Sequence, residues 1–146
     1  MIPIDQTRFG CHDPNEPANT APGNCWTACL ASILELPLSE IPDELEFWKD
    51  GMKPLDSWIP YQKKTHLWLH NKDIVIVEVR MSSVFYTGPE ECFDMYCILS
   101  GPSPRNSKVN HAVVGKGNQI VHDPHPSRKG LSGEYKYWWY EFLVRK

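Results

Sequence analysis

The spacing of apolar and polar positions changes about halfway along the chain, and this change predicts helices first and strands afterwards. Residues 1–24 are rich in Pro, Asn, Asp and Gly and are expected to form an irregular arm. Residues 25–36, CWTACLASILEL, are apolar over most of a helical surface and stop before Pro37, which predicts a buried central helix. A short helix is expected within DELEFWKDG, and another over 55–71 with an interruption near Pro60.

The second half of the chain carries strand patterns separated by Gly, Pro, Ser and Asn clusters. They cover residues 73–80, 95–101, 109–115, 119–123 and 135–144. Helices followed by strands predict an α+β fold with a mostly antiparallel sheet. The 146 residues contain no repeat or linker, so one domain is expected over 1–146.

Composition narrows the classes of function. Hydrophobic residues make up 41% of the chain and charged residues 23%, which is typical of a globular protein. A net charge of −3 gives no support to nucleic-acid binding, and no apolar stretch is long enough to cross a membrane. The N-terminus lacks the pattern of a signal peptide, so a cytoplasmic location is expected, with the five cysteines reduced.

Cys25, His111 and Asp123 are the candidates for chemistry. Cys25 stands at the expected start of the central helix, next to Gly23 and Asn24, either of which can cap that helix. A thiolate there is favoured by the helix dipole, and the unpaired backbone N–H groups can bind an oxyanion. A nucleophilic thiol needs a base and the base needs an orienting group, which His111 and Asp123 can supply.

The proposed base and its partner lie on one predicted hairpin, NHAVVG-KGN-QIVHDP. If residues 116–118 form a three-residue loop, Val113 faces Val121 and His111 faces Asp123. Directly opposed residues have Cβ atoms about 4.5–5.5 Å apart, which is close enough for an imidazole–carboxylate hydrogen bond. A two-residue turn would shift this register by one and break the match.

Each candidate also has a purely structural interpretation. Cys25 could be a small buried hydrophobic residue, His111 a core histidine and Asp123 a turn former before proline. We favour the triad, because the structural interpretation must explain all three by coincidence. His125 could line the cleft and is the second choice as base. A zinc site at 122–125 lacks the usual ligand spacing, so no metal and no cofactor is expected.

The two sequence blocks resemble the papain-like cysteine peptidases, in particular the peptidase C39-like branch. Gly23-Asn24-Cys25-Trp26 is similar to the G-x-C-W around the nucleophile of that family, and residues 110–113, NHAV, are similar to its H-A-V strand. The blocks GNCWTACLASILELP and HAVVGKGNQIVHDPHPS are closer still to small uncharacterised proteins of bacteriophages and bacteria.

The resemblance implies a papain-like fold and roles for several residues. The family usually has Gln six residues before the nucleophile, as part of the oxyanion hole. Here that position is Asn19, and Gln6 is the alternative. Trp26 and Asn24, beside the nucleophile, and His125 are expected to contact the substrate.

The predicted function is therefore a cysteine-dependent hydrolase or acyltransferase that acts on a peptide, isopeptide or glutamine side-chain amide. Peptidase, deamidase and transglutaminase-like outcomes all use the same three residues. A peptide or protein is the expected substrate, while the oligomeric state is not indicated. The alternatives are a catalytically inactive interaction protein that binds a phage or bacterial host factor, and a metal-binding module.

Overall fold

The computed structural model describes residues 1–10, 20–80, 94–117, 119–134 and 137–146. Within these residues the chain forms helices first and strands afterwards, as the sequence pattern predicts. The helical half contains two α-helices, α1 (Cys25–Leu34) and α2 (Pro54–His70), and two short 3₁₀-helices, η1 (Leu38–Glu40) and η2 (Glu44–Glu46). No helix in the described part of the chain is long and apolar enough to span a bilayer.

Helix α1 is the buried central helix that the sequence predicts. Every residue from Trp26 to Ser32 is buried, which matches a segment that is apolar almost all round. The helix ends at Leu34, two residues earlier than expected, because Glu35 adopts the left-handed conformation that commonly terminates a helix.

Two details of the helical half differ from the sequence-based expectation. The segment DELEFWKDG contains only the 3₁₀-turn η2 and no α-helix. Helix α2 runs through Pro60 without an interruption. Pro60 removes a single hydrogen bond, to the carbonyl of Asp56, and Asp56 is exposed so that water can bond to that carbonyl instead.

The strands form one five-stranded antiparallel sheet in the order β1-β5-β2-β3-β4, so the fold is α+β as predicted. Their bounds are β1 (Ile74–Arg80), β2 (Tyr96–Pro102), β3 (Asn110–Lys116), β4 (Gln119–His122) and β5 (Trp139–Arg145). The strand predicted over 135–144 begins at Trp139, and its residues 135–136 lie outside the described residues.

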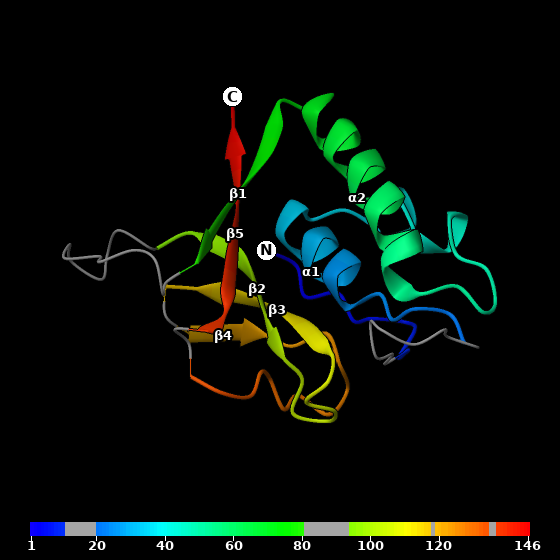
Figure 1. Ribbon diagram of the computed structural model, residues 1–146. Coiled ribbons are helices and arrows are strands. Elements are labelled where there is room, and N and C mark those ends of the chain that lie inside the picture. The colour runs from blue at the N-terminus through cyan, green and yellow to red at the C-terminus, as the bar shows by residue number, and fades with distance from the viewer. Residues whose placement is uncertain (11–19, 81–93, 118, 135–136) are drawn as a thin grey trace.

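Alternating residues of the central strands divide the core between the two faces of the sheet. On one face, Ile98, Ala112 and Val114 pack with α1 in a core cluster. Tyr61 and Leu69 of α2 belong to the same cluster. The opposite face carries a second cluster, formed by Cys97, Leu99, Val113, Tyr140 and Phe142. Figure 1 shows α1 lying against the sheet, which places the N-terminal end of this helix near the start of β3.

The N-terminal arm, residues 1–10, runs between α1 and the segment that follows β4. The backbone N–H of Ile2 donates to the Ser32 carbonyl of α1, and the N–H of Gln6 donates to the Pro124 carbonyl, each at 3.1 Å. Arg128 donates to both carboxylate oxygens of Asp5 at 2.7 Å and also contacts the Asp123 carbonyl. The arm therefore fixes the loop after β4 relative to the central helix.

Candidate active site

Cys25 is the partly exposed thiol at the N-terminal end of α1, whereas Cys29 and Cys97 are buried. Burial raises the pKa of Cys29 well above its usual value and raises that of Cys97 to about 12. These two behave as core residues. Among the described cysteines, Cys25 is the one placed for chemistry.

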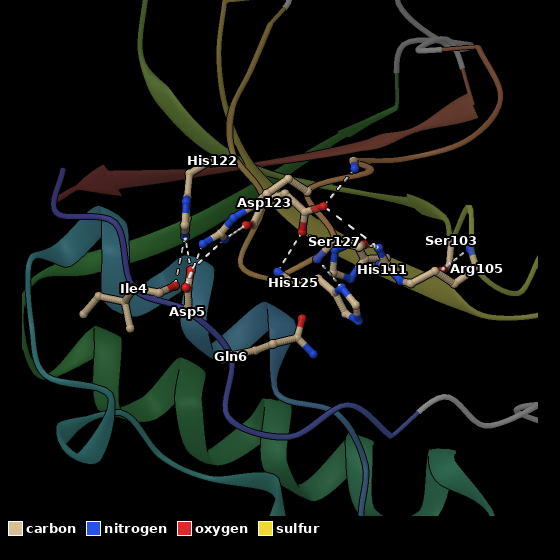
Figure 2. Close-up of polar contacts among 12 residues, drawn as sticks. Ile4, Asp5, Gln6, Ser103, Arg105, His111, His122, Asp123, His125 and Ser127 are labelled. Carbon is tan, nitrogen blue, oxygen red and sulfur yellow. Dashed lines mark hydrogen bonds and ion pairs between the residues drawn. The ribbon is translucent and has the colours of Figure 1, made fainter.

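His111 and Asp123 form a buried hydrogen-bonded pair. His111 Nε2 lies 2.7 Å from Asp123 Oδ1, and the two residues are each 5% exposed. The backbone N–H of His125 donates to Asp123 Oδ1 at 2.9 Å, and the backbone N–H of Gly130 donates to Oδ2 at 2.8 Å. Figure 2 shows the bonds of Asp123 to His111 and to His125. Gly130 has a φ of +66°, a conformation that glycine adopts readily.

The charge of Asp123 fixes the tautomer of His111. Burial raises the pKa of Asp123, but hydrogen bonds from His111, His125 and Gly130 outweigh it and lower the pKa to about 2. The ionised carboxylate can only accept, so His111 Nε2 carries the proton. This leaves Nδ1 as the nitrogen that faces other partners.

Cys25 lies beside His111, and the two residues line the same two cavities. Burial lowers the pKa of His111, but hydrogen bonds with Asp123 and with the Cys25 side chain outweigh it, so the pKa of this imidazole is raised above its usual value. Because Nε2 is bonded to Asp123, Nδ1 is the acceptor available to the thiol. The structure thus brings together all three residues that the sequence singled out.

The route by which His111 meets Asp123 differs from the predicted one. Lys116 pairs with Gln119, so two residues rather than three separate the strands. A bulge then follows, after which Val114 pairs with His122. The expected His111–Asp123 cross-strand pair is therefore wrong; instead Asp123 lies just beyond β4, where N–H groups of the following loop hold its carboxylate near His111.

Two cavities meet at Cys25 and His111. The larger, of about 640 Å³, extends between α2 and the strands β1 and β5, and the smaller, of about 300 Å³, lies beside the N-terminal arm. Arg105 and His125 line the smaller cavity together with Gln6. The nucleophile candidate therefore lies at the junction of two spaces, an arrangement that suits a substrate extending on both sides of the reacting bond.

Gln6, the alternative candidate for the oxyanion-binding amide, lines a cavity with the candidate nucleophile. It is 7% exposed and lines the smaller cavity with Cys25 and His111, and Figure 2 shows it on the arm near His125. Its Nε2 donates to the Arg8 carbonyl at 2.7 Å, which leaves a second N–H on that nitrogen. The other candidate, Asn19, lies outside the described residues.

Asn24, for which we predicted a substrate contact, is buried and bonds to the N-terminal arm. It is 3% exposed, and its Oδ1 accepts from the N–H groups of Thr7 and Arg8 at 3.0 Å, while its Nδ2 donates to Thr7 Oγ1. It stands at the N-cap position of α1 but makes no side-chain bond to the helix. The N–H groups of the first turn are therefore not capped by Asn24.

Trp26 lines the larger cavity and belongs to the core as well. Its indole packs edge-on against Trp58 and Tyr61, with ring centroids 5.9 Å apart in both cases. Its Nε1 donates to Glu141 Oε2 at 2.7 Å. Glu141, which also lines this cavity, was not singled out in the sequence; the available signal was a lone acidic residue within the apolar run YWWYEFLV.

His122 and His125 contact different parts of the protein. His125 lies edge-on to His111 at 6.1 Å, its Nδ1 accepts from the Ser127 N–H, and its pKa is lowered by burial and by Arg105 and His111. His122 instead contacts the Ile4 carbonyl at 3.0 Å (Figure 2). Among the described residues, no three His, Cys, Asp or Glu side chains are grouped as metal ligands would be.

No protein-family model matches the chain, and neither the curated proteins nor the solved structures contain a significant match. Assignment of a function therefore depends on the site itself.

Proposed function

We propose that the protein is a papain-like cysteine hydrolase or acyltransferase that acts on an amide through Cys25, His111 and Asp123. The observation that carries the proposal is the buried His111–Asp123 pair, whose second imidazole nitrogen is left to bond to the Cys25 thiol. A helix start, a base and an orienting carboxylate come from three separate segments of the chain. This is the arrangement that nucleophilic catalysis by a thiol requires.

The proposed reaction begins with transfer of the thiol proton to His111 Nδ1. The Cys25 sulfur then attacks the carbonyl carbon of the substrate, and a tetrahedral oxyanion forms. The backbone N–H of Cys25 and the second Nε2–H of Gln6 are the donors proposed to stabilise it. Asp123 holds the ring orientation and stabilises the imidazolium.

The tetrahedral intermediate then collapses with cleavage of the C–N bond. His111 returns its proton to the leaving amine, and the acyl group stays on Cys25 as a thioester. Water or an incoming amine attacks the carbonyl carbon of this thioester, and His111 accepts the proton of that nucleophile. The C–S bond then breaks, and His111 returns the proton to the Cys25 sulfur. Water gives a carboxylic acid, and an amine gives a new amide.

The proposal predicts that Cys25 is alkylated at pH 6 much faster than an ordinary thiol. An unassisted thiol is only roughly 0.3% ionised at pH 6, whereas a thiol that can pass its proton to His111 is available as thiolate. We expect iodoacetamide to label Cys25 about 10- to 100-fold faster than it labels a model peptide thiol. Peptide mapping by mass spectrometry separates Cys25 from the other four cysteines, and the Cys25→Ser variant is the control.

A rate for Cys25 equal to that of the model thiol would contradict the proposal. We would then infer that the protein is a non-catalytic interaction protein, since a fold does not by itself fix an activity.

A further inference from the structure

The larger cavity carries chemistry that the proposed reaction does not use. It extends from Cys25 and His111 toward β1 and β5, and Trp26, Trp58 and Trp139 contribute aromatic surface to its walls. Glu141 on β5 lines the same space, where its carboxylate accepts from Trp26 Nε1. An acidic group thus lies among indole rings in the cavity that the candidate nucleophile borders.

Among the described residues that set the pKa of Glu141, none is a cation. Burial raises its pKa to about 7, opposed by hydrogen bonds from Trp26 and Ser100, and Glu78 raises it further. Glu78 is the direct cross-strand neighbour of Glu141. Two carboxylates thus stand opposite each other, an arrangement that a nearby cation stabilises.

The aromatic wall of this cavity already holds a guanidinium group. The Arg80 side chain lies over the Trp139 ring, with its Cζ atom 5.1 Å from the ring centroid, and its Nε is 3.4 Å from Glu78. Indole faces combined with a carboxylate therefore accommodate a cation here, as general cation–π energetics predict.

The two cavities differ in charge. The smaller one presents Arg105 and His125, whereas the larger one contains the carboxylates of Glu44, Glu78 and Glu141 besides Arg80 and Lys108. A positively charged side chain of a bound substrate is consequently favoured in the larger cavity and disfavoured in the smaller one.

We propose that the larger cavity binds the lysine or arginine side chain of the residue whose carbonyl Cys25 attacks, with Glu141 as the specificity-determining residue. This inference rests on the proposed function of Cys25 as the nucleophile. Trp58 and Trp139 contact the aliphatic part and the charged head of the side chain, and Glu141 accepts its hydrogen bonds. A neutral side chain of equal size would leave the Glu141 carboxylate without a counter-charge.

The test uses two acyloxymethyl ketone probes, Nα-acetylated, that carry either arginine or its neutral isostere citrulline. In each, the Cys25 thiolate displaces the carboxylate leaving group, and a thioether to the methyl ketone carbon forms. We expect the arginine probe to alkylate Cys25 about 10- to 100-fold faster than the citrulline probe. Intact-mass spectrometry over time measures both rates.

Glu141→Gln is expected to abolish this preference, because glutamine still accepts from Trp26 but carries no charge. Glu46→Gln is the matched control, since Glu46 is half-exposed and pairs with Lys64 outside the cavity; it should keep the preference. The rate with iodoacetamide, which lacks a side chain, should be the same in the wild-type protein and in Glu46→Gln. The two probe rates of Glu141→Gln are each divided by the iodoacetamide rate of that variant, so that only the preference between the probes is compared.

The outcomes separate this inference from the proposed function. Fast labelling by iodoacetamide with equal rates for the two probes overturns the subsite and leaves the nucleophile intact. If Cys25 is not activated, NMR titration of the Cys25→Ser protein with Nα-acetyl-arginine methylamide decides the question. A shift of the Trp26 indole N–H that is lost in Glu141→Gln supports the cation site, and no shift overturns it.

Discussion

Replacing His111 with glutamine is expected to reduce the alkylation rate of Cys25 at pH 6 to that of an ordinary thiol, and to slow any turnover by about 10²- to 10⁴-fold. Glutamine can still donate an N–H to Asp123, but it cannot accept the thiol proton. The hydrogen bonds with Asp123 and Cys25 raise the pKa of His111, which favours the imidazolium that forms when the ring accepts the thiol proton. Iodoacetamide labelling of the variant, followed by peptide mapping, measures the loss.

The matched control is His122→Gln. His122 lies eleven residues further along the chain and contacts the Ile4 carbonyl on the N-terminal arm rather than Cys25. Its replacement should leave the labelling rate within about twofold of wild type, because substitutions away from the reacting groups have small effects. Equal losses in the two variants would mean that the effect comes from the fold and not from a base at position 111.

Replacing Asp123 with asparagine is expected to lower both reactivity and stability. One oxygen of Asp123 accepts from His111 and His125, and the other accepts from Gly130. If the amide NH₂ replaces the oxygen that accepts from Gly130, two N–H donors face each other. If the NH₂ instead replaces the oxygen bonded to His111, Nε2 of the imidazole must accept a hydrogen bond from it. The ring proton then moves to Nδ1, and the thiol loses its acceptor. We expect about 10²-fold slower labelling of Cys25.

The stability effect of Asp123→Asn has a defined pH dependence. The pKa of Asp123 is about 2 in the folded protein, against 3.8 for an ordinary aspartate, so its charged form stabilises the fold. This contribution, roughly 1–3 kcal/mol, is fully present above about pH 5 and is lost as the pH falls toward 2. Urea unfolding should therefore show a large deficit for the variant at pH 7 and a smaller one at pH 2.5.

Asp94→Asn is the control for this substitution. Asp94 pairs with Lys116 at 2.8 Å, and its side chain is 73% exposed, so its loss should change the free energy of unfolding by less than about 1 kcal/mol. If Asp123→Asn were no more destabilising than Asp94→Asn at pH 7, the carboxylate would not be the buried anchor of the site that the geometry describes.

The fold class could be predicted from the sequence because the apolar spacing changes sharply after residue 71. The near-continuous apolar run of α1 and the β-branched run of β1 leave little choice of structure. Local signals failed where tertiary context decides. Pro60 did not end α2, since the lost bond falls on an exposed carbonyl, and DELEFWKDG did not form a helix beyond one 3₁₀-turn.

The sequence indicated that His111 and Asp123 form a pair, but not the geometry by which they meet. Choosing between a two-residue and a three-residue loop at Gly117 cannot be done from the residues alone, and the bulge after it has no clear sequence signal. The contact between His111 and Asp123 survives because loop N–H groups, not strand register, position the carboxylate. The fixing of Asn24 by the arm depends equally on long-range contacts.

The sequence contains a signal for Glu141, an acidic residue within the apolar run YWWYEFLV, which the prediction did not use. A charged residue at the centre of an apolar strand is costly unless it is paired or used. Here it faces a cavity beside the candidate nucleophile, with only Trp26 and Ser100 as hydrogen-bond partners among the groups that set its pKa.

The central claim is that Cys25 accepts an acyl group with help from His111, and reaction with 4-nitrophenyl acetate tests it most directly. We expect the wild-type protein to release a burst of about one equivalent of nitrophenolate and to carry the acetyl group as a thioester on Cys25, as ping-pong chemistry requires. Cys25→Ser should show no burst. Release at the same rate by wild type and Cys25→Ser, with no thioester at Cys25, would contradict the account.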